Sequence, residues 1–152
     1  MSPVKLENDA TFVHFMSSRD KGFQQAITIY QSFIPEDAQT DPSEIAYWVD
    51  RGGKVSQGAK SFCGGLTVHG EIIGFAHWAA LRNARVGFLD YVALAPQART
   101  TQNVGAFLSL LSMVVDAGMG VVLTEVLDDP VLTRFCRMEG FRHIQAPYYR
   151  HP

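Results

Sequence analysis

Residues 88–118, FLDYVALAPQARTTQNVGAFLSLLSMVVDAG, contain the pattern on which the fold assignment depends. The stretch predicts a strand, a tight polar turn and a helix, in that order. A strand that leads into a helix through such a turn commonly holds a phosphate, because the first turn of a helix has unpaired backbone N–H groups. Phosphate-binding turns are usually rich in glycine, whereas this turn contains only Gly105. The stretch is therefore either a modified phosphate site or an ordinary connection between a strand and a helix.

The composition of the chain is typical of one globular domain, and we expect residues 1–152 to form it. Lys and Arg number 13 against 15 Asp and Glu, a net charge of -2. This balance gives no basic surface for nucleic acid or for an anionic membrane, so neither is expected as a partner. The sequence has no apolar run long enough to cross a bilayer. Because it also lacks a signal-peptide pattern and a CxxC motif, a reduced, cytoplasmic protein is expected.

Hydrophobic periodicity predicts the secondary structure on both sides of this stretch. Strand pairs around short turns come before β-α-β crossovers, an order that predicts a mixed α/β sheet with helices on both faces. Asp41 and Pro42 are typical of the start of a helix. The apolar run at 120–127 predicts a strand that is buried on both sides. We expect strands at 11–16, 85–94 and 120–127, a strand pair with a turn at His69–Gly70 within 61–81, helices at 19–34, 42–51, 103–116 and 130–140, a polar loop at 54–60 and an extended segment at 141–152.

The segment GGKVSQGAKS, residues 52–61, partly resembles a nucleotide-binding P-loop. That motif needs a lysine directly after its last glycine, so that the lysine reaches the phosphates. Here Ala59 separates Gly58 from Lys60, and no apolar helix follows. A surface loop is the expected structure.

Two further groups of residues suggest chemistry. His69 and His77 are close in sequence to Cys63, but their spacing fits no zinc-binding pattern. We therefore expect no metal and interpret both histidines as core or surface residues. No serine has the setting of a G-x-S-x-G nucleophile. Cys136 is a candidate thiol nucleophile, although a cysteine on an apolar helix is more often a small core residue.

Four segments in the second half of the chain together resemble one known family. The run LDYVALAPQARTTQNVGAFL at 89–108 is similar to family runs such as LEYLAVDPEYRGKGIGSALL. VVLTEVL at 121–127 is similar to strands such as LLLEVE, FCRMEGFR at 135–142 to FYERLGFR, and APYYRHP at 146–152 to a Tyr-x-x-Pro ending. On these residues the chain resembles the GNAT superfamily of acyl-CoA-dependent N-acyltransferases. The resemblance implies a mixed, mostly antiparallel α/β sheet with helices on both faces.

The resemblance also implies that acetyl-CoA is the co-substrate. In the family, its pyrophosphate lies on backbone N–H groups of the turn, at the positive end of the next helix. The pantetheine arm lies along the preceding strand, where a backbone N–H polarises the thioester carbonyl. The corresponding residues in this chain are Val92, Ala93 and Leu94 on the strand, and Arg99, Thr100, Thr101, Gln102, Asn103, Val104 and Gly105 in the turn.

The turn departs from the family pattern, and this keeps an alternative open. Gln102 and Asn103 add bulk where the family has glycines, and alignment to the glycine pattern needs a one-residue insertion. The expected function is N-acetylation of a primary amine on a small molecule or a protein. The alternative is a GNAT-fold protein that binds a ligand or a partner without catalysis. An unrelated α/β module is a third interpretation.

Amine acylation needs a base, because an alkyl ammonium with a pKa of about 10.4 must lose a proton before it attacks. Asp90 and Glu125 are the acidic residues within apolar strands, and both align with acids of similar sequences. Asp90 is the preferred candidate base. The family tyrosine that protonates the departing thiolate corresponds to Cys136 in this chain. The loss of that tyrosine weakens the acid help without excluding catalysis.

We also expect a homodimer. The family usually closes its sheet with one more strand, so the last segment here would present an unpaired edge to another chain. Tyr148 and Tyr149 add apolar surface to that edge. Pro147 and Pro152 limit how far a ladder could extend, and a monomer with a blunted edge is the alternative.

Overall fold

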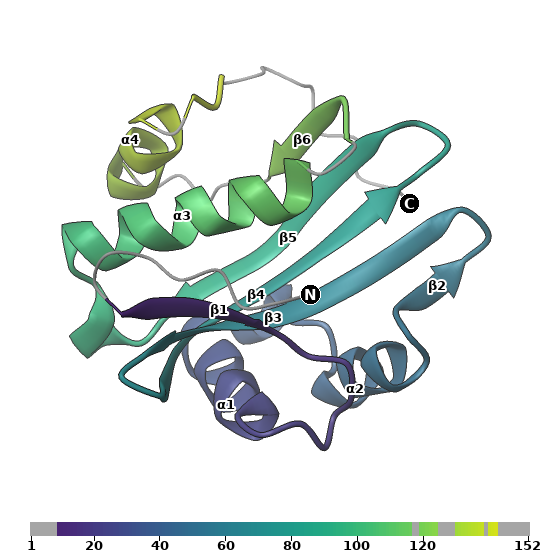
Figure 1. The fold of residues 1–152 in the computed structure, drawn as a ribbon, viewed down its shortest axis with the longest axis horizontal. Coiled ribbons are helices and arrows are strands. Elements are labelled where there is room, and N and C mark those ends of the chain that lie inside the picture. Colours follow the sequence, from purple (N-terminus) through teal and green to yellow (C-terminus); the bar gives the residue numbers. More distant parts are fainter. Residues whose placement is uncertain (1–8, 117–118, 125–129, 139, 143–152) are drawn as a thin grey trace.

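The structure is a computed structural model that describes residues 9–116, 119–124, 130–138 and 140–142. A six-stranded sheet forms the middle layer, with α1 and α2 on one face and α3 and α4 on the other (Figure 1). The prediction of helices on both faces is therefore confirmed. The elements are β1 (Ala10–His14), α1 (Phe23–Phe33), η1 (Glu36–Ala38), α2 (Pro42–Asp50), β2 (Lys54–Ser56), β3 (Ala59–Val68), β4 (Glu71–Leu81), β5 (Val86–Leu94), η2 (Pro96–Ala98), α3 (Thr101–Asp116), β6 (Val121–Thr124) and α4 (Pro130–Met138).

The sheet has the strand order β1-β3-β4-β5-β6, and β2 pairs with one end of β3. All pairs are antiparallel except β5 with β6, which is parallel. This confirms the prediction of a mixed, mostly antiparallel sheet in which hairpins precede the crossover. The β3–β4 turn falls at His69 and Gly70, where the φ angles are 51° and 82°. Positive φ at both central residues matches the twist of a tight hairpin.

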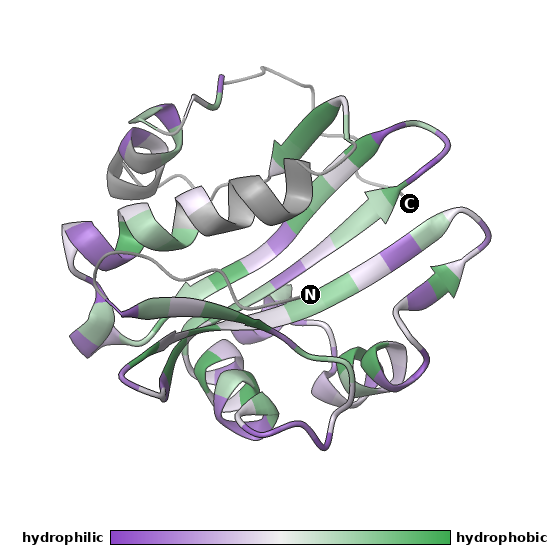
Figure 2. Ribbon diagram, viewed as in Figure 1, coloured by the Kyte–Doolittle hydropathy of each residue, from purple (hydrophilic) through white to green (hydrophobic). Residues whose placement is uncertain are grey.

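Each face of the sheet has its own apolar cluster. Phe23, Ile27 and Tyr30 of α1 pack on one face, because their spacing places them on one side of the helix. Phe107 of α3 packs on the other face with Trp78 and with residues of β1 and β5. Figure 2 shows hydrophobic residues along the central strands and hydrophilic residues at the β4–β5 turn.

The first residues of α2 fold as their chemistry predicts. The side chain of Asp41 accepts a hydrogen bond of 2.8 Å from the backbone N–H of Ser43, and Pro42 occupies the first helical position. This N-cap satisfies one of the unpaired donors of the first turn. It also ends the loop between α1 and α2, which contributes to the candidate site.

Two predictions about strands are wrong. The polar segment at 54–60 is not a loop, because β2 and the start of β3 form a hairpin there. The strand within 120–127 is not buried on both sides over its described part. Val121 and Leu123 of β6 are 52% and 37% exposed, since β6 is the last described strand at this side of the sheet. The predicted extended segment at 141–152 lies mostly outside the described residues.

Candidate active site

Strand β5 has a β-bulge at Asp90. In the β4–β5 ladder Trp78 pairs with Leu89 and His77 pairs with Tyr91, so Asp90 is an extra residue between the two pairs. A bulge of this kind shifts the alternation of side chains along a strand. Accordingly, Leu89 packs in the cluster beneath α3, whereas Tyr91 packs against the α1 cluster. The bulge therefore brings Asp90 and Tyr91 to the face that carries α1 and α2.

The carboxylate of Asp90 pairs with His77 on this face. His77 Nδ1 lies 3.1 Å from Asp90 Oδ2, and the two side chains are 4% and 32% exposed. The indole of Trp48 in α2 stacks on the imidazole, with ring centroids 5.7 Å apart and planes 23° apart. Asp90 is thus the member of the pair that faces solvent, and His77 lies behind it.

The loop between α1 and α2 is tied to β5 beside this pair. Tyr91 Oη donates to the carbonyl of Ala38 at 2.9 Å and lies 3.1 Å from Thr40 Oγ1. Tyr30 Oη donates to the carbonyl of Thr40 at 3.0 Å and accepts from its N–H at 2.7 Å. Burial raises the pKa of Tyr30, with Tyr91 and Asp90 nearby adding to the effect, so this phenol keeps its proton. The loop therefore borders the Asp90 site in a defined position.

Several acidic residues belong to this loop and to the start of α2. All of them are exposed, and the sequence places them on both sides of the segment that Tyr91 holds. Hydrogen bonds from Ser43 lower the pKa of the Asp41 carboxyl, which favours its charged form. The acids are Glu36, Asp37, Asp41 and Glu44.

The predicted pantetheine-binding residues Val92, Ala93 and Leu94 follow the bulge. On one side they pair with β4, at Ala76, Phe75 and Gly74 in turn. On the other side, the ladder with β6 ends at the pair Leu89–Thr124 within the described residues. The part of β5 from Asp90 onward therefore has no described strand on the β6 side.

The turn after β5 ends at the first residue of α3. Thr100 caps this helix, since its Oγ1 accepts from the N–H of Asn103 at 3.1 Å and its carbonyl accepts from the N–H of Val104 at 3.0 Å. No described residue accepts a hydrogen bond from the N–H groups of Thr101 and Gln102, and both residues are exposed. Unpaired N–H groups at the start of a 16-residue helix favour an anion at this point.

Two polar side chains of the turn serve its own structure. Arg99 Nε donates to the carbonyl of Leu94 at 3.0 Å, and its guanidinium lies 5.1 Å from the ring centroid of Phe33. Asn103 Nδ2 donates to the carbonyl of Ala98 at 3.0 Å. The Arg99 bond holds the turn against the end of β5, and the Asn103 bond ties the start of α3 to the preceding turn. Gly105 lies within the first turns of α3.

Two further residues were predicted to be catalytic, Glu125 and Cys136. Glu125 lies outside the described residues. Cys136 is a half-buried free cysteine on α4, and burial raises the pKa of its thiol. Its carbonyl accepts from the N–H of Phe141 at 2.9 Å. Of the predicted site residues, Asp90 and residues 92–105 lie together on the unit formed by β5, the following turn and the start of α3.

The partner of Asp90 is a residue whose role the sequence pattern did not predict. His77 is indeed a buried histidine, but it is paired with a carboxylate. One signal could have suggested this pair. The β4–β5 hairpin pairs Leu81 with Val86. A regular ladder counted from that pair, backward along β4 and forward along β5, would place His77 opposite Asp90. The other histidine, His69, is exposed in the β3–β4 turn.

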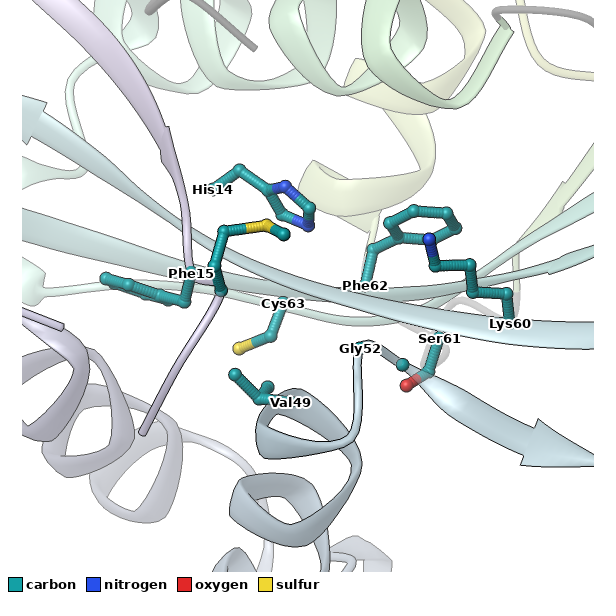
Figure 3. A pocket seen from close by; sticks show the side chains of 10 residues that line it. His14, Phe15, Val49, Gly52, Lys60, Ser61, Phe62 and Cys63 are labelled. Carbon is teal, nitrogen blue, oxygen red and sulfur yellow. The ribbon is translucent and has the colours of Figure 1, made fainter. Parts of the chain in front are cut away.

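A small cavity lies elsewhere, between β1, β3 and α2. Its volume is about 20 Å³, enough for about one water molecule and too small for a cofactor. Figure 3 shows the thiol of Cys63 directed toward Val49 and the ring of His14 on the other side of the strand. Burial raises the pKa of the Cys63 thiol. Burial and the nearby Lys60 ammonium lower the pKa of His14. We do not assign the acyl-CoA site to this cavity.

Within the described part of the chain, no helix has both the length and the hydropathy needed to cross a membrane. No group of three His, Cys, Asp or Glu side chains among those residues is arranged to hold a metal ion. No protein-family model matches the chain, and no curated protein matches its sequence.

Solved structures, in contrast, match the chain over nearly its whole length. An aminoglycoside acetyltransferase from an uncultured soil metagenomic sample, in complex with sisomicin, matches with a TM-score of 0.73 and 10% identity, over 97% of this chain and 99% of its own. A ribosomal-protein-alanine N-acetyltransferase from Brucella melitensis matches with a TM-score of 0.64 and 13% identity, over 95% and 97%. An aminoglycoside N-acetyltransferase in complex with CoA matches with a TM-score of 0.64 and 14% identity, over 95% and 99%. The chain therefore has the fold of the GNAT acetyltransferases.

Proposed function

We propose that the chain is an acyl-CoA-dependent N-acyltransferase that moves the acetyl group of acetyl-CoA to a primary amine of a small molecule or a protein. The observation that carries this proposal is the position of Asp90. A partly exposed carboxylate lies at the bulge of β5, on the same strand-turn-helix unit whose first helical N–H groups are unpaired. This arrangement supports a base and an anion-binding turn on one strand-turn-helix unit.

The turn supplies the contacts for the co-substrate. The N–H groups of Thr101 and Gln102 are the donors for the pyrophosphate, helped by the positive end of α3. The pantetheine arm runs along β5 from Leu94 toward Asp90, beside a backbone that has no described strand on its β6 side. This path brings the thioester to the bulge.

Asp90 then acts on the acceptor. It takes a proton from the ammonium group, and the free amine attacks the thioester carbonyl carbon. The tetrahedral intermediate collapses as the C–S bond breaks, which releases the amide product and the CoA thiolate. As the intermediate collapses, its nitrogen loses a second proton to solvent, and the thiolate takes a proton from solvent or from a nearby acid. Cys136 holds the position of that acid in the family, and its raised pKa keeps the thiol protonated.

The acceptor class is inferred from charge. The four exposed acids of the α1–α2 loop and the start of α2 favour a cationic amine over a neutral one. Among proteins with this fold, two of those compared are aminoglycoside acetyltransferases, and aminoglycosides are polycationic amines. We therefore propose a small cationic amine as the first class of acceptor to test.

A second candidate function follows from the turn itself. The contacts of Arg99 and Asn103 occupy polar groups that would otherwise be available to a phosphate. Together with a cysteine at the tyrosine position, this favours a GNAT-fold protein that binds a ligand or partner without catalysis. The two candidates differ in whether acetyl-CoA binds and is consumed.

Isothermal titration of the purified chain with acetyl-CoA separates the two candidates. The enzyme is expected to bind acetyl-CoA with micromolar affinity, and mass spectrometry should detect acetylation of at least one amine in a panel of aminoglycosides, polyamines and peptides. Absence of binding at millimolar acetyl-CoA would reject the enzyme. Binding without acetylation of any panel member supports the binding protein.

A further inference from the structure

His77 has an unusual set of contacts for a buried polar residue. Its exposed fraction is 3%, and its Nε2 has no hydrogen-bond partner among the described residues. Burial of an unpaired polar atom costs free energy, so a residue that serves only to fill the core would be better replaced by an apolar one. Among the described residues, the polar partner of the His77 side chain is Asp90.

The contact determines which nitrogen of His77 carries the proton. An ionised carboxylate only accepts hydrogen bonds, so His77 must present an N–H at Nδ1 when Asp90 is charged. In the neutral imidazole Nε2 then has the lone pair, and this atom is buried. Trp48 of α2 stacks on the ring and restricts its rotation. The imidazole is thus held in one orientation with its donor directed at the carboxylate.

We infer that His77 is a positioning residue for Asp90. It holds the carboxylate in one rotamer at the bulge and stabilises its charged form, as a buried donor does for an exposed base. This inference rests on the proposed function, in which Asp90 is the base. His77 does not take the substrate proton itself, because its free nitrogen Nε2 is buried.

The α1–α2 loop, which Tyr91 holds beside Asp90, carries the acids Glu36, Asp37 and Asp41, and carboxylic acids change charge in the acid range. Across β3 the register partner of His77 is Cys63, and on β5 its neighbour is Tyr91. Tyr30 of α1 lies close enough to Asp90 for the two charges to interact. Thiols and phenols are neutral below about pH 7. The loop acids are the same in every variant, so a difference between variants in the pH profile from about pH 3 to 7 reports on His77 and Asp90.

A matched pair of substitutions tests the inference. His77→Asn places an amide nitrogen at the position of Nδ1 and keeps a donor for Asp90, whereas His77→Leu has a similar shape and no donor. We expect His77→Leu to lower kcat by about tenfold or more, with the acidic limb of the kcat/KM profile moved to higher pH. His77→Asn should recover most of this loss. KM for acetyl-CoA should stay unchanged in both variants.

A second readout does not depend on activity. The 13C resonance of the Asp90 carboxyl, followed by NMR across pH, should titrate at a higher pH in His77→Leu than in the wild type and return in His77→Asn. If no amine is acetylated by any of the proteins, the proposed function fails, and this titration alone decides the inference. Equal titration in all three proteins overturns it. If His77→Leu does not fold, His77→Gln replaces it, because its amide nitrogen lies at the Nε2 position and cannot reach Asp90.

Discussion

Asp90 is the residue on which the proposed chemistry depends. Its carboxylate is the exposed member of the pair with His77, and the bulge separates it from the regular ladder of β5. A carboxylate in this position can accept a proton at the moment of attack, whereas an amide cannot. A substitution of Asp90 is therefore expected to affect the chemical step and not the binding of the co-substrate.

Asp90→Asn should lower kcat by about a hundredfold while KM for acetyl-CoA changes little, because a base acts only in the chemical step. Steady-state kinetics from pH 6 to about 10 measure both constants. At high pH more of the amine is already deprotonated, so the variant should regain part of its activity. Glu125→Gln is the paired control. An Asp90→Asn variant with wild-type kcat at neutral pH would remove Asp90 from the mechanism.

Arg99 combines a structural role with a proposed role in binding. Arg99→Ala should weaken acetyl-CoA binding by about 1–3 kcal/mol, the range expected for a charge-assisted hydrogen bond. Arg99→Lys is the matched control, because it keeps the charge but loses the Nε donor that bonds to Leu94. Isothermal titration gives Kd for all three proteins. If Kd is the same in Arg99→Ala and in the wild type, Arg99 does not contact the co-substrate.

Among the elements, α3 has the most direct influence on the site, because its first turn is the proposed phosphate contact and its body packs on β4. Gly74 of β4 permits this approach. A Cβ at Gly74 would lie 2.9 Å from Leu94 Cδ2 and 3.1 Å from Phe107 Cε1. Both atoms belong to the well-packed cluster on the α3 face, so neither can move freely.

Gly74→Ala should destabilise the fold by about 1–3 kcal/mol, as overpacking of a buried site does. Urea denaturation followed by circular dichroism measures this change. Gly105→Ala is the control, because a Cβ there meets no described atom within 4 Å and α3 gains helix propensity. The control should be neutral or stabilising by up to about 1 kcal/mol. An unchanged midpoint for Gly74→Ala would show that α3 does not pack on β4 as closely as the structure indicates.

For the whole molecule, the state of association is the open prediction. We expect a homodimer in which the C-terminal segments meet or cover exposed sheet edges. Tyr148, Tyr149 and both prolines of that segment lie outside the described residues, so we expect the dimer from the sequence alone. Light scattering across a dilution series measures the mass. A strictly monomeric mass at the highest concentration would contradict the prediction.

The sequence by itself determined the helices α1 to α4, the described strands other than β2, and their order. Local signals decide these features: Asp41 and Pro42 begin α2, the residues His69 and Gly70 suit a hairpin turn, and apolar spacing predicts α1 and α3. In the chain, strand pairs joined by short turns come before the β-α-β crossover. This order was sufficient to predict a mixed sheet with helices on both faces. Such signals act over a few residues, so they can be recognised without knowledge of the packing.

Only the tertiary structure decided how the candidate site is assembled. The bulge at Asp90, its pairing with His77 and the attachment of the α1–α2 loop to Tyr91 all depend on strand register. Register is set by packing on both faces of the sheet at once, and one extra residue in β5 moves the later side chains to the other face. The segment that forms β2 is a further example. Its polar composition did not predict a strand, but it forms one because it pairs with β3.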